Sequence, residues 1–398
     1  MPKKSVVDLD LTNKRILMRV DFNLPLDGDT VADDTRIQAA LPTLRYLLEK
    51  GAALVLISHL GRPQGRPATE FSLRPVADRL SRLLGLQVQM APDCLGPQVE
   101  AMAANLRPGE ILLLENLRFH PEEEGNDPDF AGRLASLGQV FVNDAFGTAH
   151  RAHASTEGVV HHMDRAVSGL LMEKEIAYLQ DALLSPKRPF LAILGGAKIS
   201  GKVEVIEHLL DRVDVLLIGG GMQFTFFKAM GMEIGDSLLE QETVDVAARV
   251  LEQAGEKGVE LVLPLDTIAA KAFAADAEIC TIDIHDLTAG WQGLDIGPST
   301  CALFSAKIAQ ARTVIWNGPV GVFEMTPFSG GTRAVAEAVA DATQAGAISI
   351  IGGGDTAAAV NQFGFGERMS HISTGGGASL ECIAGRDLPG VVALDDRD

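Results

Sequence analysis

Short apolar stretches recur along the chain, and each is followed by a Gly-, Asp- or Asn-rich turn and then by a segment with helical spacing. Several stretches are apolar without alternation, which is typical of strands buried on both faces of a parallel sheet. The predicted strands are 15–20, 53–57, 111–114 and 140–142 in the first half, and 190–194, 215–218, 261–263, 313–316, 348–351 and 371–373 in the second.

The segments between these strands carry the helical period, most clearly at 36–50, 73–84 and 330–345. Strand–helix alternation in both halves predicts an α/β fold with two Rossmann-like lobes, each a parallel sheet flanked by helices. The pattern at 170–184 predicts one amphipathic helix. This helix should end at the Ser-Pro-Lys-Arg-Pro sequence of residues 185–189. We expect this helix to join the lobes, and a cleft between two lobes is a common place for a ligand site.

Glycine is frequent, with 41 residues in a chain of 398, against an average share of about 7%. The glycines gather at the predicted ends of second-half strands, at 195–196, 219–221, 352–354 and 375–377. Backbone without side chains can approach a ligand closely at such strand ends. One triplet alone would more often be a plain turn, but four clusters at one sheet edge favour a nucleotide or phosphate cradle.

The strand ends of the first half carry polar and basic side chains instead. The sequences RVDFN (19–23), SHLGRP (58–63), LENLRFH (114–120) and NDAFGTAHR (143–151) each end a predicted strand or follow one. In a doubly wound sheet these ends converge on one crevice. Each cation alone could be a surface ion pair, but together they predict a basic pocket suited to phosphate and carboxylate, formed by Arg36, His59, Arg62, Arg118 and Arg151.

The sequence at 196–202 matches the first seven positions of a P-loop, GxxxxGK, between a strand and a helix. Val203 stands where a P-loop has the Ser or Thr that ligates Mg²⁺, so the match is incomplete. Lys198 and Lys202 would still lie at a helix N-terminus, where backbone amides and the helix dipole favour anions. The alternative is two solvated lysines at the start of a helix.

Two carboxylates follow other strands of the second half. Asp355, in the GGGDT turn at 352–356, could serve a Mg²⁺ that keeps most of its waters. It could also be the N-cap of the following helix, a role equally open to Thr356. Glu324, after the sequence WNGPVGVF at 316–323, could accept hydrogen bonds from a ribose or be an ordinary surface carboxylate.

The charge balance changes which partners are expected. A net charge of −19 argues against nucleic-acid binding, and an anionic metabolite would need a local cluster of cations. The N-terminal sequence MPKKS lacks the apolar stretch of a signal peptide, and no apolar run reaches the roughly 18 residues of a membrane span. We expect a cytoplasmic protein whose scattered cysteines are reduced thiols, namely Cys94, Cys280, Cys301 and Cys382.

Nine segments of the sequence together resemble the phosphoglycerate kinase family, in that family's order and spacing from residue 15 to the C-terminus. They are RVDFN (19–23), SHLGRP (58–63), LENLRFH (114–120), NDAFGTAHRAHAST (143–156), LMEKE (171–175), GGAK with a second lysine (195–202), WNGPVGVFE (316–324), GGGDT (352–356) and STGGGAS (373–379). The resemblance implies a hinged, two-lobed monomer. It also implies reversible phosphoryl transfer from 1,3-bisphosphoglycerate to MgADP, giving 3-phosphoglycerate and MgATP in glycolysis or gluconeogenesis.

The resemblance further implies roles for particular residues. The phosphoglycerate site would comprise Asp21, Phe22, Asn23, Arg36, His59, Leu60, Gly61, Arg62, Arg118 and Arg151. The nucleotide site would comprise Lys202, Gly293, Glu324, Gly353, Gly354, Asp355 and Thr356, with Asp355 holding Mg²⁺. The migrating phosphoryl group would be stabilised by Arg36, Lys198, Lys202 and Gly376.

The resemblance also implies a discontinuous phosphoglycerate-binding domain, residues 1–170 with about 386–398, a linking helix at 171–187 and a nucleotide-binding domain at 188–385. The sequence departs from the family between the two lysines, where Ser200-Gly201 replaces the usual Ser-Asp or Ala-Asp. This removes a carboxylate that could pair locally, so the positioning of the lysines is the open detail.

An acyl phosphate is already activated and its leaving carboxylate needs no proton, so no general base is predicted. We expect the lobes to close, because the reacting oxygens must be aligned and water excluded. Two other functions remain open at this point. One is a different ATP-dependent small-molecule kinase built on residues 196–202, and the other is a two-lobed anion- or nucleotide-binding protein without catalysis.

Overall fold

The computed structural model describes residues 3–397, and the chain divides into two compact units. The N-terminal lobe comprises the residues up to Ala177 and those from Asp387 onward, and the C-terminal lobe comprises Tyr178–Arg386. Helix α6 (Leu170–Leu184) contains the point where one lobe gives way to the other, and it has the bounds that the sequence predicts.

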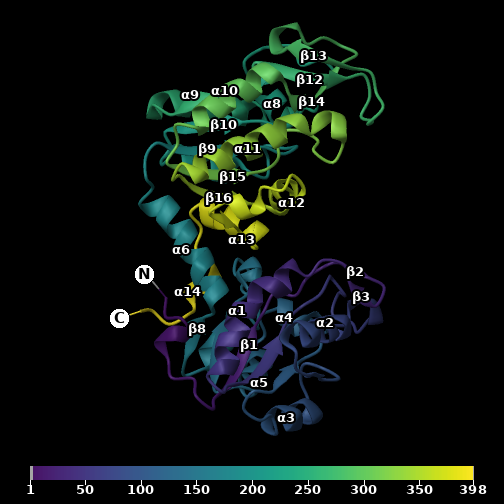
Figure 1. Ribbon diagram of the computed structural model, residues 1–398, viewed down its shortest axis with the longest axis vertical. Coiled ribbons are helices and arrows are strands. Elements are labelled where there is room, and N and C mark those ends of the chain that lie inside the picture. Colours follow the sequence, from purple (N-terminus) through teal and green to yellow (C-terminus); the bar gives the residue numbers. More distant parts are fainter. Residues whose placement is uncertain (1–2, 398) are drawn as a thin grey trace. The chain divides into compact units, whose positions relative to one another are not determined.

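The N-terminal lobe is built on a six-stranded sheet in the order β5-β6-β4-β1-β7-β8, with every pair of neighbours parallel. Figure 1 labels β1 and β8 of this sheet. The strands are β1 (Arg15–Arg19), β4 (Ala53–Ile57), β5 (Val88–Met90), β6 (Ile111–Leu113), β7 (Val140–Asn143) and β8 (Ala166–Ser168). A small hairpin is formed by β2 (Leu26–Asp27) and β3 (Thr30–Val31). The helices are α1 (Thr35–Glu49), α2 (Arg74–Leu84), α3 (Pro97–Ala104), α4 (Pro121–Glu124), α5 (Pro128–Ala135) and α14 (Pro389–Val392).

Successive side chains of the central strands enter different cores. Ile16 and Met18 of β1 pack in a cluster with the apolar faces of α1 and α2, whereas Leu17 packs with those of α3 and α5. Because both faces of the sheet are covered, the strand sequences are apolar without alternation. Residues from Asp387 onward return to this lobe, where Nδ2 of Asn143 donates to the carbonyl of Gly390 at 3.0 Å.

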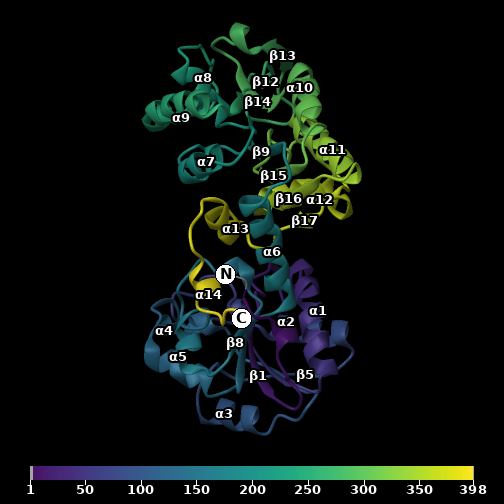
Figure 2. The ribbon, with the colours of Figure 1, turned by 90° about the vertical axis from the view of Figure 1, so that its left-hand side faces the viewer.

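The C-terminal lobe contains a second six-stranded parallel sheet, in the order β11-β10-β9-β15-β16-β17. Figure 2 shows α7, α9 and α13 on one side of this sheet and α10, α11 and α12 on the other. The strands are β9 (Phe190–Leu194), β10 (Val215–Ile218), β11 (Glu260–Val262), β15 (Thr313–Asn317), β16 (Ile348–Gly352) and β17 (His371–Ile372). The helices are α7 (Val203–Leu210), α8 (Gln223–Ala229), α9 (Val244–Lys257), α10 (Pro298–Ile308), α11 (Gly330–Gln344), α12 (Gly354–Gln362) and α13 (Gly376–Ile383).

The C-terminal lobe also holds an antiparallel sheet that the sequence pattern does not predict. It consists of β12 (Asp266–Ala270), β13 (Ile279–Asp283) and β14 (Gln292–Ile296), in the order β13-β12-β14. Strand β13 is largely exposed, so it lacks the apolar run by which buried strands are recognised. The three-residue strands β5 and β8 at the edges of the first sheet were missed as well.

The predicted α/β fold with two parallel sheets is confirmed. The bounds of every strand and helix predicted from the sequence lie within one residue of the observed bounds. Among residues 3–397, no helix is both long and apolar enough to cross a membrane. Within the described residues, Cys94, Cys280, Cys301 and Cys382 form no disulfide.

Candidate active site

The polar segments of the N-terminal lobe meet at one edge of its sheet. Strands β6, β4, β1 and β7 are neighbours and run parallel, so their carboxyl ends lie side by side. The segments that follow them, 114–120, 58–63, 20–23 and 144–151, carry most of the predicted phosphoglycerate residues. The predicted convergence of these strand ends is confirmed.

Arg36 is held close to the end of β1 by an ion pair. It lies in the first turn of α1, and its Nη1 is 2.5 Å from Oδ2 of Asp21. Oδ1 of Asn23 accepts a hydrogen bond from the amide of Gly61 at 2.9 Å, which ties the segment after β1 to the segment after β4. The Arg36 side chain is 34% exposed, so its remaining donors are open to an anion.

Phe22 and Leu60 belong to this edge through their backbone. Both side chains are buried in the core that lies against α1 and α2. The amide of Phe22 donates to Oγ of Ser58 at 2.9 Å, a second link between the two strand ends. Their predicted place in the phosphoglycerate site is therefore limited to main-chain atoms.

Arg118 is the most enclosed of the predicted arginines. It lies in the short 3₁₀ turn Leu117–Phe119 after β6, and its side chain is 4% exposed. Its Nη1 donates to the carbonyl of Gly61 at 2.8 Å, and its Nε lies 3.3 Å from Oε1 of Glu124. Burial lowers the pKa of Arg118, and Glu124 acts in the opposite direction. A guanidinium remains a cation in such surroundings.

Arg151 and Arg62 are less enclosed. Arg151 is half-buried, and its Nε donates to Nε2 of His150 at 3.1 Å. Its carbonyl accepts from Oγ1 of Thr156 at 2.7 Å, which fixes the loop after β7. The side chain of Arg62 is exposed. Since a guanidinium has five N–H donors, both residues keep donors for a ligand.

His59 is not a cation, which corrects the prediction of a pocket with five cationic side chains. The ring is 2% exposed. Burial, and then the neighbouring Arg19 guanidinium, lower the pKa of His59 well below its ordinary value of 6.5. The imidazole is therefore neutral at neutral pH, and the positive charge at this edge comes from arginines.

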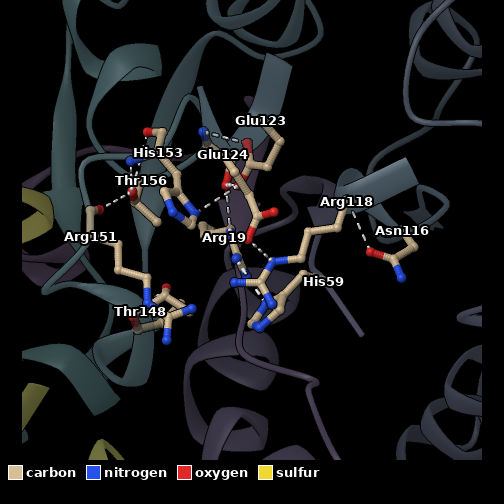
Figure 3. A network of polar contacts seen from close by, with 12 residues as sticks. Arg19, His59, Asn116, Arg118, Glu123, Glu124, Thr148, Arg151, His153 and Thr156 are labelled. Carbon is tan, nitrogen blue, oxygen red and sulfur yellow. Dashed lines mark hydrogen bonds and ion pairs between the residues drawn. The ribbon is translucent and has the colours of Figure 1, made fainter. Parts of the chain in front are cut away.

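A buried charge network behind this edge was missed in the sequence. Arg19 at the end of β1 and Glu123 in α4 are both buried, and Ser155 bridges them. Figure 3 shows Arg19 between Glu123 and His59. Arg19 is part of the RVDFN motif, but Glu123 lies in an acidic run at 122–124 that resembles an exposed helix start, so the sequence gives no signal of its burial.

The glycine-rich turns of the C-terminal lobe also meet at one sheet edge. Strands β10, β9, β15, β16 and β17 are parallel neighbours. The turns after them at 219–221, 195–196, 352–354 and 375–377 hold the four glycine clusters, so their predicted common edge is confirmed. A Cβ on Gly195 would lie 2.1 Å from the carbonyl oxygen of Pro319, because the backbones after β9 and β15 are in direct contact.

Two helices begin close together at this edge. Gly353 precedes α12 with φ of 89°, a conformation that favours glycine. The amide nitrogen of Gly354 lies 3.9 Å from the position that a Cβ on Gly376, the first residue of α13, would take. Backbone amides at two adjacent helix N-termini form a favourable site for an anion.

Lys202 is the N-cap residue of α7, but its side chain turns back towards the strand ends. Its Nζ donates to the carbonyl of Gly195 at 2.7 Å, to the carbonyl of Asn317 at 3.0 Å and to Oδ1 of Asn317 at 2.7 Å. Burial lowers the pKa of Lys202 to about 8, while Asp355 acts to raise it. All three ammonium hydrogens have protein acceptors, so a bound phosphate must replace at least one of them.

The loop before α7 is held by a carboxylate that the sequence analysis did not single out. Glu240 accepts hydrogen bonds from the amides of Ile199 and Ser200 at 2.6 and 3.1 Å, and from Oγ of Ser200 at 2.6 Å. Lys198 is exposed in this loop rather than part of the helix N-terminus, which corrects that part of the prediction. Gly201 is exposed, with open space where its Cβ would be.

A pocket of about 610 Å³ lies at this edge of the C-terminal lobe. Its lining combines glycine backbone from the turns after β9 and β10 with apolar side chains, among them Leu238, Phe273 and Val322. The predicted nucleotide residues Gly293, Glu324 and Asp355 also line it. A concave, largely apolar site with a few polar groups suits a planar base with an attached polar chain.

Close packing at position 293 leaves no room for any residue larger than glycine. A Cβ there would lie 2.2 Å from Cζ of Phe224 and 2.6 Å from Oγ1 of Thr267. A side chain at this position would therefore displace β14 from its neighbours, and the floor of the pocket would change with it. The apolar lining residues Leu238 and Phe273 carry no sequence signal of their own, because single apolar residues in loops are common.

Neither Asp355 nor Thr356 is a helix N-cap, which corrects that alternative. Gly353 occupies the N-cap position of α12. Thr356 is buried, and its Oγ1 accepts from the amide of Gly318 at 2.7 Å. Among residues 3–397, the carboxylate of Asp355 has no hydrogen-bonding or ion-pair partner, and the residue is exposed beside the pocket. Carboxylate oxygen is a ligand that Mg²⁺ prefers, and one such ligand suffices for an ion that keeps its waters, so Asp355 fits that role.

The N-terminal lobe thus gathers arginines at one sheet edge, and the C-terminal lobe has glycine-rich turns and a pocket of about 610 Å³ at the corresponding edge. These features define a two-lobed α/β phosphotransferase. The sequence model of the phosphoglycerate kinase family matches residues 6–386. The chain is 57% identical to the phosphoglycerate kinase of Chloroflexus aurantiacus and 56% identical to that of Prosthecochloris aestuarii, each over the full length of both chains. The chain belongs to the phosphoglycerate kinase family.

Solved structures agree with this assignment. The structure of phosphoglycerate kinase from Coxiella burnetii matches with a TM-score of 0.91 and 43% identity over 99% of both chains. The enzyme from Pyrococcus horikoshii matches with a TM-score of 0.84 and 32% identity over 98% of both chains. The predicted phosphoglycerate kinase function, as a transferase of glycolysis, is confirmed, and neither another small-molecule kinase nor a non-catalytic binding protein is favoured.

Proposed function

We propose that the N-terminal lobe binds 3-phosphoglycerate and 1,3-bisphosphoglycerate, and that the C-terminal lobe binds ADP and ATP. The observation that carries this proposal is the guanidinium cluster at one sheet edge of a chain whose net charge is −19. An acidic protein gathers cations in this way where it must hold an anion against its own field. The glycine-lined pocket of the other lobe supplies the complementary nucleotide site.

In the N-terminal lobe, the arginines would grip the phosphate and carboxylate groups of the substrate. Arg62 and Arg151 would act through their open donors, and Arg118 through the donors that Gly61 and Glu124 leave unused. Asp21 and Asn23 would orient the substrate hydroxyl group and hold the loop. The neutral His59 would donate a hydrogen bond, and Phe22, Leu60 and Gly61 would contribute backbone atoms.

In the C-terminal lobe, the base would pack against the apolar lining and Gly293, with Glu324 accepting from the ribose hydroxyls. Gly353, Gly354 and Thr356 would present the start of α12 to the phosphates. Asp355 would hold Mg²⁺, which neutralises charge on the phosphate oxygens when bound. The apolar lining favours a nucleotide over a free phosphate as the ligand of this lobe.

For the chemical step, we propose direct in-line transfer of the phosphoryl group. Arg36, Lys198, Lys202 and the amide of Gly376 would surround the equatorial oxygens of the migrating group with positive charge. No side chain needs to remove a proton, because the acceptor is a phosphate and the leaving group is a carboxylate. A ring of donors without a general base is sufficient for such a transfer.

Because the two substrates would bind to different lobes, we propose that both must be bound for the lobes to close. Closure would bring donor and acceptor oxygens into line and exclude water that would hydrolyse the acyl phosphate. The helix α6 is where bending would occur. Small-angle X-ray scattering should show a smaller radius of gyration with both substrates than with either one, and an unchanged radius would contradict closure.

A coupled assay of ATP formation from 1,3-bisphosphoglycerate tests the overall reaction. Isothermal titration with each ligand alone tests the division between lobes. ADP affinity should survive Arg62→Ala, and 3-phosphoglycerate affinity should survive Glu324→Ala. Loss of both affinities in either variant would contradict the separate sites.

We also propose that the enzyme acts as a monomer in the cytoplasm. Each proposed ligand site is built within one lobe of a single chain, so none needs a second copy to be complete. Sedimentation velocity at micromolar concentration should give one species with the mass of one chain, 42.2 kDa. A dimer that persists on dilution would contradict this state.

A further inference from the structure

We propose that Arg19 locks the imidazole of His59 in the Nε2–H tautomer, so that His59 presents a hydrogen-bond donor to the substrate. Arg19 is then a positioning residue that acts through His59. The inference rests on the proposed place of His59 in the phosphoglycerate site, and its tautomer part can be measured without any substrate.

The tautomer follows from the chemistry of the two side chains. Nη2 of Arg19 lies 3.1 Å from Nδ1 of His59. A guanidinium has N–H donors and no acceptor, so Nδ1 must be the acceptor in this hydrogen bond. A neutral imidazole carries one N–H, which leaves the proton on Nε2. Among residues 3–397, Nε2 of His59 has no hydrogen-bonding partner, so this N–H is available to a ligand.

Arg19 is fixed by contacts on its other nitrogens. Its Nε donates to Oγ of Ser155 at 2.9 Å, and its Nη1 donates to the carbonyl of Val20. Ser155 in turn donates from Oγ to Oε1 of Glu123 at 2.5 Å and from its amide to Oε2 at 3.0 Å. Figure 3 shows this chain of contacts from Glu123 to His59. The guanidinium cannot rotate away from His59 without losing these hydrogen bonds.

The hydrogen-bonded side chains from Glu123 to His59 are buried, which strengthens their hold on the tautomer. Arg19 is 1% exposed and Glu123 is 0% exposed. The two opposite charges compensate each other through Ser155, since a buried unpaired charge would be very costly. Glu123 also has His153 at 3.9 Å from its Oε1. Because Arg19 and Glu123 are buried, water competes little for the hydrogen bonds that hold the guanidinium.

The surroundings of His59 also oppose its protonation. The largest charge effects on it come from four cations, namely Arg19 from β1, Arg118 from the turn after β6, Arg36 from α1 and Arg151 from the loop after β7. Burial and these four charges hold the pKa of His59 well below 6.5. A protonated ring would also point Nδ1–H at the Arg19 guanidinium, where two donors would face each other.

The consequence for binding is specific. A neutral Nε2–H can donate to a carboxylate or phosphate oxygen, and this contribution does not change as the pH falls from about 8 to 6. A cationic histidine would strengthen binding over that range as it became protonated. Hydrogen bonding by a fixed donor adds direction to a site whose charge already comes from arginines.

The first experiment measures the tautomer in the unmodified protein. Nitrogen-15 NMR of the full chain with labelled histidine, with His59 assigned by His59→Gln, should show Nδ1 unprotonated and Nε2 protonated from pH 6 to 8. A proton on Nδ1, an averaged pair of resonances or a protonated ring in this range would overturn the inference. Since no variant of Arg19 is involved, failure to fold cannot obscure the result.

The second experiment uses matched substitutions of His59. The amide nitrogen of Gln can take the place of Nε2–H, whereas that of Asn is too short and lies near Nδ1. We expect His59→Asn to weaken 3-phosphoglycerate binding at least about tenfold, as for loss of one hydrogen bond to a charged group. His59→Gln should retain most of the affinity. Equal losses in the two variants would overturn the donor role.

The third experiment tests the positioning residue. Arg19→Lys keeps the positive charge but loses the planar guanidinium, whose separate N–H groups reach both Ser155 and His59. We expect the KM for 3-phosphoglycerate to rise more than kcat falls, and the histidine NMR signals to show both tautomers. An unchanged Nε2–H tautomer in a folded Arg19→Lys protein would overturn the role of Arg19. The unmodified protein could show the Nε2–H tautomer while both His59 variants keep the original affinity for 3-phosphoglycerate. This result would support the lock and contradict the proposed substrate contact.

Discussion

The two lobes share one framework, but the anion sites proposed for them are built by different means. Each has six parallel strands and uses the carboxyl edge of its sheet. In the N-terminal lobe the proposed donors are long side chains such as Arg36, Arg118 and Arg151. In the C-terminal lobe the proposed donors are backbone amides at the starts of α12 and α13, with Lys202 as a half-buried cation beside them.

The difference follows from what each lobe is proposed to hold. A three-carbon acid with anionic groups at both ends offers little apolar surface, so the guanidinium groups of arginines must supply the affinity. A nucleotide brings a base that packs on apolar residues, and its phosphates can be held by dipoles that cost no side-chain entropy. The same fold therefore supports two kinds of site, because strand-end loops and not the sheet decide the chemistry.

The largest expected effect separates the two kinds of site. Lys202→Ala and Arg36→Ala should each lower turnover at least about tenfold, which is roughly 1.4 kcal/mol of barrier. Arg36→Ala should also weaken phosphoglycerate binding and leave ADP binding unchanged. Lys202→Ala should weaken ADP binding and leave phosphoglycerate binding unchanged. The exposed Arg45→Ala and Lys271→Ala are matched controls. Steady-state kinetics with both substrates varied would check this, and near-normal turnover in both variants would refute the assigned roles.

A pH effect should appear in both lobes. Burial raises the pKa of Asp144 in the N-terminal lobe and of Asp295 in the C-terminal lobe to about 7, from 3.8. Each protonated carboxyl stabilises its lobe fully below the ordinary value, and this contribution is lost as the pH rises through 7. Between the ordinary value of 3.8 and about 7, the free energy of unfolding should fall by up to about 1.4 kcal/mol per pH unit for each group, and it should level off at higher pH.

Asn substitutions can tell these two contributions apart. Asp144→Asn and Asp295→Asn should each remove, in one lobe, the loss of stability that accompanies a rise in pH from 3.8 to about 7. Both tryptophans, Trp291 and Trp316, belong to the C-terminal lobe, so fluorescence in urea reports Asp295→Asn and circular dichroism reports both. A pH slope that is unchanged in both Asn variants would contradict protonated carboxyls at these positions.

A smaller effect tests the backbone site directly. Gly353 has φ of 89°, and a Cβ there would lie 2.9 Å from Nδ2 of Asn317. Gly353→Ala should cost about 1–2 kcal/mol of folding stability through left-handed strain, and should weaken ADP binding while leaving 3-phosphoglycerate binding unchanged. Urea unfolding and titration calorimetry would measure both, and unaltered ADP affinity would argue against this turn as the phosphate cradle.

The smallest effect concerns the departure from the family pattern. Gly201 has no close neighbour at its Cβ position and lies outside the positive-φ region. Gly201→Ala should therefore raise stability by about 0.4–1 kcal/mol by restricting the unfolded chain. Gly201→Asp should leave kcat within about twofold, because Glu240 already holds the loop. A large gain of activity in Gly201→Asp would show that the missing carboxylate matters.

Much of the fold could be predicted because its signals are local. Strands buried on both faces are apolar throughout, so β4, β9 and β10 were found with their observed bounds. The edge strands β5 and β8 and the exposed β13 carry no such run and were missed. The convergence of the strand-end segments could be predicted for the same reason, since parallel strands place their carboxyl ends together.

The sequence by itself determined the two parallel sheets, the residues at their carboxyl edges and the family. The tertiary structure decided the states of those residues: that His59 is neutral, that Lys202 turns inward onto Asn317, and that Asp355 is open to the pocket. The reason is that charge state and side-chain direction depend on burial and on partners far away in the chain. Glu123 is linked to His59 through Ser155 and Arg19, although it lies 64 residues further along the sequence, and no local sequence pattern predicts that link.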